Sequence, residues 1–181
     1  DSYTREFNSI KDFETLAVIK VSLTVPSGIV SIGIAQLAND LEIVLPLSLN
    51  GYLVTNNILT LRDIRSFGGL KIKADLQDSE YDDAQEAIAL LDAHAKLETL
   101  SSDLNLNAKV IQQGYTSVYK IASTTQSQFL EDLIGSSANN FEATKLYKVA
   151  AAHSKMFTAV YSQHRMGSLR VGGDTHIGEI L

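Results

Sequence analysis

Cysteine is absent from the 181 residues of this chain. Without it the protein cannot form disulfides, use a thiolate nucleophile or build a cysteine-based zinc or iron–sulfur site. The sequence also lacks an Asn-x-Ser/Thr sequon, so N-glycosylation is excluded. Walker, Gly-x-Gly-x-x-Gly and Gly-x-Ser-x-Gly motifs are all missing. Because no nucleophile, acid–base pair or cofactor motif can be named, we expect a protein that is not an enzyme and binds no cofactor.

Positive charge is scarce as well, with 15 Lys and Arg against 21 Asp and Glu and a formal net charge of −6. Most of the acidic excess lies after Asp75. Nucleic acids are bound through clustered positive charge, so we expect no nucleic-acid partner. The chain starts at Asp1 rather than Met, which we interpret as favouring a processed mature chain, secreted or part of an assembly, although no feature assigns a compartment.

Two windows of 19 residues, Val21–Asn39 and Ile43–Leu61, contain no charged side chain. Their length alone would suit membrane spans. However, prolines and the Asn50-Gly51 pair interrupt them, and their apolar residues alternate with polar ones. We therefore interpret the windows as buried strands. The alternative is an amphipathic β-hairpin that enters a bilayer after oligomerising, so membrane contact stays open without being favoured.

The N-terminal part of the chain shows the period of two that is typical of strands. Asn50-Gly51 is a strong signal for a two-residue hairpin turn, although 34–41 would also suit a short helix. Before the strands, the spacing of Tyr3, Phe7 and Ile10 predicts a short helix. Residues 1–77 are therefore predicted to be a short helix followed by an antiparallel β-meander, with strands at 19–25, 30–34, 43–49, 58–61 and 70–76.

After Ser79 the period changes to that of amphipathic helices. A first helix has start signals at Ser79 and Asp82, and a second covers 111–133 with a break expected between Gly114 and Thr125. A third runs from Asn139 or Asn140 to Gly167. We therefore predict a bundle of two or three long helices over 78–167, an arm or strand over 168–181, and the α+β fold class, because the strands come first and the helices afterwards.

The histidines and acidic residues do not form a predicted metal site. Asp174-Thr175-His176 has the opening of a metal motif but lacks further ligands. His153 and His164 share a helix face but lie about 16 Å apart along its axis. We interpret His94 and Glu98, one turn apart, as an exposed helical pair, and His153 as a hydrogen-bonded core residue.

The third helix carries the predicted interaction site. It is long and has a broad apolar surface with tyrosines at its margin, and such surfaces are commonly buried against a partner. We therefore predict a structural or interaction protein that self-associates or joins a larger assembly. The alternatives are a binding protein for a small apolar ligand between sheet and helices, and a membrane-active protein. The predicted interface residues are Leu146, Tyr147, Val149, Ala150, Phe157, Val160 and Tyr161.

Overall fold

The structure of the chain is a computed structural model that describes residues 30–134 and 140–178, with side chains placed up to Met166. Within these ranges the chain is helical and forms no β-strand or sheet. Its β-type pairing there is a single antiparallel bridge between Gly33 and Thr60. The predicted α+β class and the predicted β-meander are therefore wrong, and the strand expected at 19–25 lies outside the described residues.

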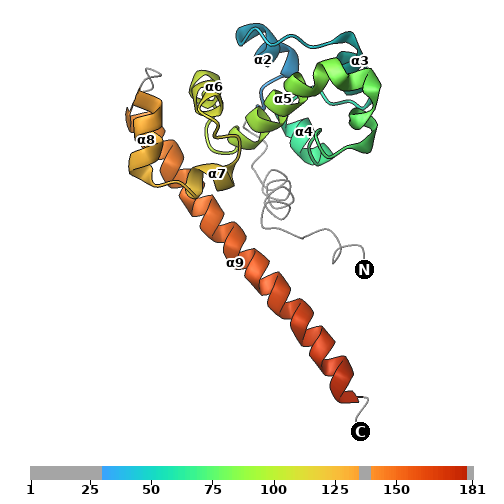
Figure 1. The fold of residues 1–181 in the computed structure, drawn as a ribbon, viewed down its shortest axis with the longest axis vertical. Helices are drawn as coiled ribbons and strands as arrows, with labels where there is room; N and C mark the ends of the chain where they lie inside the picture. The colour runs from blue at the N-terminus through green and yellow to red at the C-terminus, as the bar shows by residue number, and fades with distance from the viewer. Residues whose placement is uncertain (1–29, 135–139, 179–181) are drawn as a thin grey trace.

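The described elements are short helices, and the last one, α9, is far longer than the others (Figure 1). In chain order they are α2 (Ile34–Asp40), α3 (Leu47–Thr55), α4 (Leu61–Phe67), the 3-10 helices η1 (Ala74–Gln77) and η2 (Ser79–Ala84), α5 (Gln85–Leu97), α6 (Leu104–Gln112), α7 (Val118–Ala122), α8 (Gln126–Ile134) and α9 (Asn140–Gly178).

The strand expected at 43–49 is replaced by a loop and the start of α3. In α3 the buried side chains are Leu49 and Leu53, four residues apart, whereas Leu47 is 89% exposed. A strand would have placed Leu47 and Leu49 on the same face. The expected hairpin turn lies inside this helix, where the Asn50 amide donates to the Pro46 carbonyl at 2.9 Å. The short-helix alternative for 34–41 matches α2.

The strand expected at 58–61 is instead a short loop that leads into helix α4, and α4 begins at a capping box. The Thr60 hydroxyl accepts from the Asp63 amide, and the Asp63 carboxylate accepts from the Thr60 amide at 2.9 Å. This reciprocal pair satisfies amides that have no partner inside the helix. The strand expected at 70–76 is a turn followed by η1. In a sheet the amides of Leu70 and Lys71 would donate to a neighbouring strand. Here both donate to the Asp92 carboxylate of α5, each at 2.8 Å.

Two apolar cores form on opposite sides of α5. Ile88, Leu91 and Ala95 pack with α2, α3 and α4, while Ala93 and Leu97 pack with α6, α7, α8 and α9. Because α5 contributes to both cores, it ties the N-terminal helices to the C-terminal ones. The first long helix of the predicted bundle, α5, therefore packs against both parts of the chain. The predicted division into two parts at residue 78 stays a prediction.

The second predicted helix is broken, as we expected between Gly114 and Thr125. Helix α6 ends before Gly114, which adopts a left-handed φ of 88° that glycine tolerates without strain. The Ser117 hydroxyl then caps α7, and a second break at residues 123–125 separates α7 from α8. These turns let α6, α7 and α8 share a core with α9, in which Phe129 of α8 is fully buried. Gly135, our predicted stop, lies outside the described residues.

Helix α9 starts at Asn140 as predicted, but it continues beyond the predicted stop at Gly167 to Gly178. A single glycine costs a helix only about 1 kcal/mol, so it need not end one. The arm or strand predicted for 168–181 is therefore helical as far as Gly178. The first part of α9 packs on α7 and α8, where Tyr147 donates its hydroxyl to the Thr124 carbonyl at 2.7 Å. The remainder runs on past the other labelled helices (Figure 1).

Candidate functional site

The seven predicted interface residues on α9 divide according to their depth. Leu146, Ala150 and Phe157 are buried in the protein's own core, so they pack within the chain. Tyr147, Val149 and Tyr161 are half-buried, and Val160 is 46% exposed. The available surface is therefore narrower than the sequence suggested.

Two methionines extend the exposed apolar surface of α9. Met156 is 43% exposed and lies one turn before Val160, and Met166 is 65% exposed further along the helix. Sequence reasoning missed both, although the four-residue step from Met156 to Val160 was the available signal. With Tyr161 at the margin, Met156 and Val160 form what we call the α9 apolar surface, whereas Met166 lies about 120° further round the helix from Val160.

The part of α9 whose side chains are described also carries a net positive charge. Between 140 and 166 the chain has one acidic residue, Glu142, and four exposed basic ones: Lys145, Lys148, Lys155 and Arg165. The Arg165 guanidinium lies 5.9 Å from the centre of the Tyr161 ring, within cation–π range. From the sequence we considered only the net charge of the whole helical half, which is negative, and so missed this basic stretch.

An acidic surface lies on the other part of the molecule, from η1 to the first turn of α5. No Lys or Arg occurs between Lys73 and Lys96. Six carboxylate side chains in this interval are all exposed to solvent. We define the acidic surface by these residues: Asp75, Asp78, Glu80, Asp82, Asp83 and Glu86.

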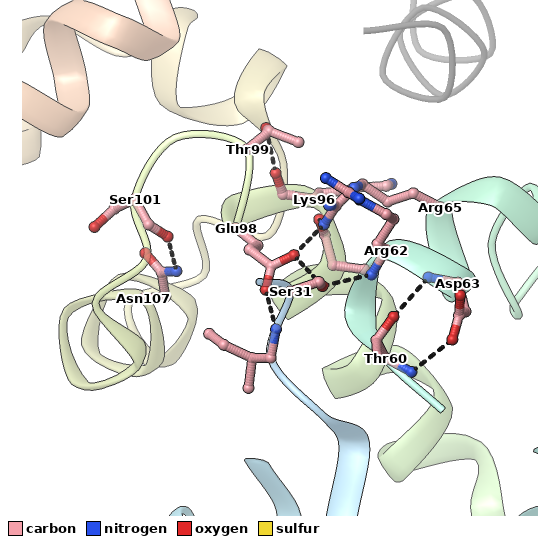
Figure 2. Close-up of polar contacts among 12 residues, drawn as sticks. Ser31, Thr60, Arg62, Asp63, Arg65, Lys96, Glu98, Thr99, Ser101 and Asn107 are labelled. Carbon is pink, nitrogen blue, oxygen red and sulfur yellow. Dashed lines mark hydrogen bonds and ion pairs between the residues drawn. The ribbon is translucent and has the colours of Figure 1, made fainter. Parts of the chain in front are cut away.

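A buried ion pair joins α4 to the end of α5 (Figure 2). Arg65 Nη1 lies 2.9 Å from Glu98 Oε1, and the two side chains are 8% and 9% exposed. Arg65 also donates to the Ala95 carbonyl at 2.7 Å. Glu98 accepts from the Ser31 hydroxyl at 2.7 Å and from the Ile32 amide at 2.9 Å. Because both charges are paired and hydrogen-bonded, this network holds the segment before α2 against α4 and α5.

The expected exposed pair between His94 and Glu98 is not formed. Glu98 binds Arg65, and His94 is 2% exposed with no hydrogen-bond partner for its buried Nδ1 in the described part of the chain. Burial lowers the pKa of His94 to about 4, because an imidazolium is poorly solvated there. Helical spacing could not reveal this burial, because it shows that His94 and Glu98 lie one turn apart but not which other elements cover them.

A half-open cleft of about 240 Å³ lies between α4, the turn after it and α5. Its lining includes Asp92, whose two carboxylate oxygens accept hydrogen bonds from the Leu70 and Lys71 amides. Burial raises the pKa of Asp92, and the two backbone hydrogen bonds and the nearby ammonium groups of Lys96 and Lys71 act in the opposite direction. Sequence reasoning missed this cleft because its walls come from elements that we had assigned to different halves of the chain.

No metal-binding cluster is formed by the His, Asp and Glu residues whose side chains are placed. His153 lies against Phe157 with ring centres 6.0 Å apart, and burial lowers its pKa. His164 is exposed. The side chains of Asp174 and His176 lie outside the described ones. None of the helices in the described ranges has the length and apolar character required to cross a membrane.

Comparison with known proteins gave no match to a protein-family model, to a curated protein or to a solved structure. Function must therefore be argued from α9, the acidic surface and the cleft.

Proposed function

We propose that this protein is an assembly subunit that associates with further copies of itself through α9. The observation that supports the proposal most directly is the combination of length and exposure in this helix. Its 39 residues span about 58 Å, and it extends beyond the other labelled helices (Figure 1). Apolar side chains on such an extension are usually covered by a partner.

The composition of the extension supports the same proposal. Four glycines, at 167, 172, 173 and 178, fall in the last twelve residues of α9. Each glycine costs a helix about 1 kcal/mol relative to alanine, and an uncovered helix is marginal in water even without them. Contact with a second copy would supply the missing stabilisation.

Charge favours a second copy of this chain as the occupant. The basic side chains of α9 and the acidic surface have opposite sign and are both exposed. Opposite charges on two surfaces accelerate encounter and orient the partners. If α9 of one copy meets the acidic surface of the next, the contact is heterologous and forms a ring or a filament.

The test is sedimentation velocity of the intact chain at micromolar concentration and after dilution. We expect an oligomer for the natural sequence, and dissociation for Val160→Asp, because this change places a charge in the α9 apolar surface. Thr158→Asp is the matched control, since it adds the same charge at an exposed position on another face of the same helix. Association should survive in that variant.

A single species near the 19.7 kDa of one chain at every concentration would contradict the proposal. Equal dissociation by both variants would show that charge on α9, and not the apolar surface, decides the contact. Circular dichroism of each variant shows whether the helices remain folded.

The membrane-active alternative rested on two uncharged windows, and one of them does not form the expected hairpin, while residues 21–29 of the other lie outside the described ones. Residues 43–61, expected as a strand pair, contain the helix α3 and its flanking loops. The ligand-binding alternative retains a cavity, the cleft between α4 and α5, although no sheet borders it in the described ranges.

A further inference from the structure

The cleft between α4 and α5 collects positive charge in an acidic part of the chain. Residues 30–134 contain seven Lys and Arg against fourteen Asp and Glu. Three of those seven basic residues, Arg65, Lys71 and Lys96, line the cleft, and Asp92 is the one acidic residue among its walls. If charged residues were spread evenly over this part of the chain, the cleft would carry more acidic than basic side chains.

The charge that is available to a ligand comes from the two lysines. Arg65 is balanced by Glu98 at 2.9 Å. Neither Lys71 nor Lys96 forms an ion pair with a described carboxylate, although both ammonium groups are close enough to Asp92 to affect it. Both lysines line the cleft, so their charge is available to a ligand there.

Asp92 adds a second kind of polar group to the lining. Each of its oxygens already accepts one backbone amide, from Leu70 or from Lys71, at 2.8 Å. A carboxylate oxygen can accept more than one hydrogen bond, so each has a remaining acceptor position. These positions suit a hydroxyl or ammonium donor on a ligand and would repel a second bare carboxylate.

Apart from Thr116, the remaining lining residues are apolar or glycine. Ile64 and Ala93 are buried, Ala89 is exposed, and Ile72 is 72% exposed. Small-molecule sites combine such apolar walls with a few converging polar groups. The exposed Ile72 would be partly covered by a ligand with a short apolar portion.

We propose that this cleft binds a small organic anion that has a short apolar portion and a hydrogen-bond donor beside its anionic head. Lys71 and Lys96 bind the head, which is a carboxylate or a phosphate. Asp92 accepts from the neighbouring donor, and Ile64 and Ile72 contact the apolar portion. The cleft contains no α9 residue, so this site is separate from the proposed self-association.

Three probes test the anionic head and its chemistry, and each is titrated into the intact chain by calorimetry and by ligand-observed NMR. Phenyllactate has a carboxylate, a neighbouring hydroxyl and a ring. Phenyl phosphate supplies the other anionic head, and phenylethanol has the ring without an anion. We expect at least one of the two anions to bind and phenylethanol to bind far more weakly.

Lys96→Met should weaken binding of the anion by about tenfold, the effect of one charge-assisted hydrogen bond. Lys109→Met is the matched control, because it removes the same charge from α6, outside the cleft. Binding of phenyllactate alone would identify a carboxylate ligand, and binding of phenyl phosphate alone a phosphate ligand. The proposal is overturned if neither anion binds, if phenylethanol binds equally well, or if the two lysine variants behave alike.

Discussion

His94 is a buried imidazole whose Nδ1 has no described hydrogen-bond partner. Its pKa in the folded chain is about 4, below the ordinary histidine pKa of 6.5. Between these two values the unfolded chain binds more protons than the folded chain. The free energy of unfolding therefore falls as the pH decreases through this window and is fully retained above it.

Replacing His94 with leucine should remove this dependence. We expect the natural chain to lose up to about 3 kcal/mol between pH 6.5 and 4 on account of this residue, and His94→Leu to lose correspondingly less. The measurement is urea unfolding at a series of pH values. Asp92, with its raised pKa, acts in the opposite direction and His153 in the same one, so the comparison between variant and natural chain isolates His94.

If His94→Leu retains the full dependence, the imidazole is not buried as described.

The Arg65–Glu98 network shows which residue contacts the sequence could not reveal. Glu98 lies one turn after His94, and helical spacing made that histidine its natural partner. The actual partners come from Arg65, Ser31 and Ile32, which are more than thirty positions away. Periodicity reports which residues share a face of one element, whereas a buried ion pair depends on which elements meet.

At the scale of single elements, Gly51 distinguishes the helix α3 from the hairpin that the sequence suggested. In α3 this glycine has a helical conformation, and a Cβ added to it would meet no atom within 4 Å. In a two-residue hairpin turn the same glycine would need a positive φ, which alanine adopts only with strain. The two structures therefore predict opposite signs for one substitution.

Gly51→Ala should raise the free energy of unfolding by about 0.5 to 1 kcal/mol, because alanine is the better helix former. Gly69→Ala is the contrasting variant, since Gly69 has a φ of 87°, and it should destabilise. Chemical unfolding of the two variants and the natural chain gives the comparison. A loss of stability in Gly51→Ala would favour the hairpin.

The sequence predicted the long helices better than the short ones. The start of α9 and the broken second helix followed from sustained apolar spacing and from Gly114. Short apolar runs such as 43–49 and 58–61 fit a strand and a helix equally, because a few residues do not distinguish a period of two from one of 3.6. Thr60 and Asp63, at capping-box spacing, were the readable signal that a helix begins at Leu61.

The candidate site was predicted in part and for a similar reason. Apolar spacing identified α9 as a helix with an apolar face. Spacing alone does not show which residues on that face are buried when the helix extends beyond the helices that pack on it. Phe157 and Val160 are three residues apart, yet one is 3% and the other 46% exposed. Which of them is covered depends on where α7 and α8 end, and that is a property of the packed molecule.

At the scale of the whole molecule, the described chain carries its two signs of charge in different places. The acidic surface lies from η1 to α5, and the basic side chains lie along α9. Screening by salt weakens contacts between exposed charges, because the Debye length falls from about 10 Å at 0.1 M to about 3 Å at 1 M. Contacts between apolar side chains are not weakened in this way.

Self-association should therefore weaken as sodium chloride is raised, if α9 of one copy meets the acidic surface of another. Lys155→Glu should weaken it at low salt, and so should Asp82→Lys combined with Asp83→Lys, because each creates a repulsive pair. Mixing the two variants should restore association, since the reversed α9 of one then meets the reversed acidic surface of the other. Sedimentation velocity of each variant and of the mixture provides the measurement. Association that is unaffected by salt, or a mixture no better than its components, would show that α9 binds a different surface of the second copy.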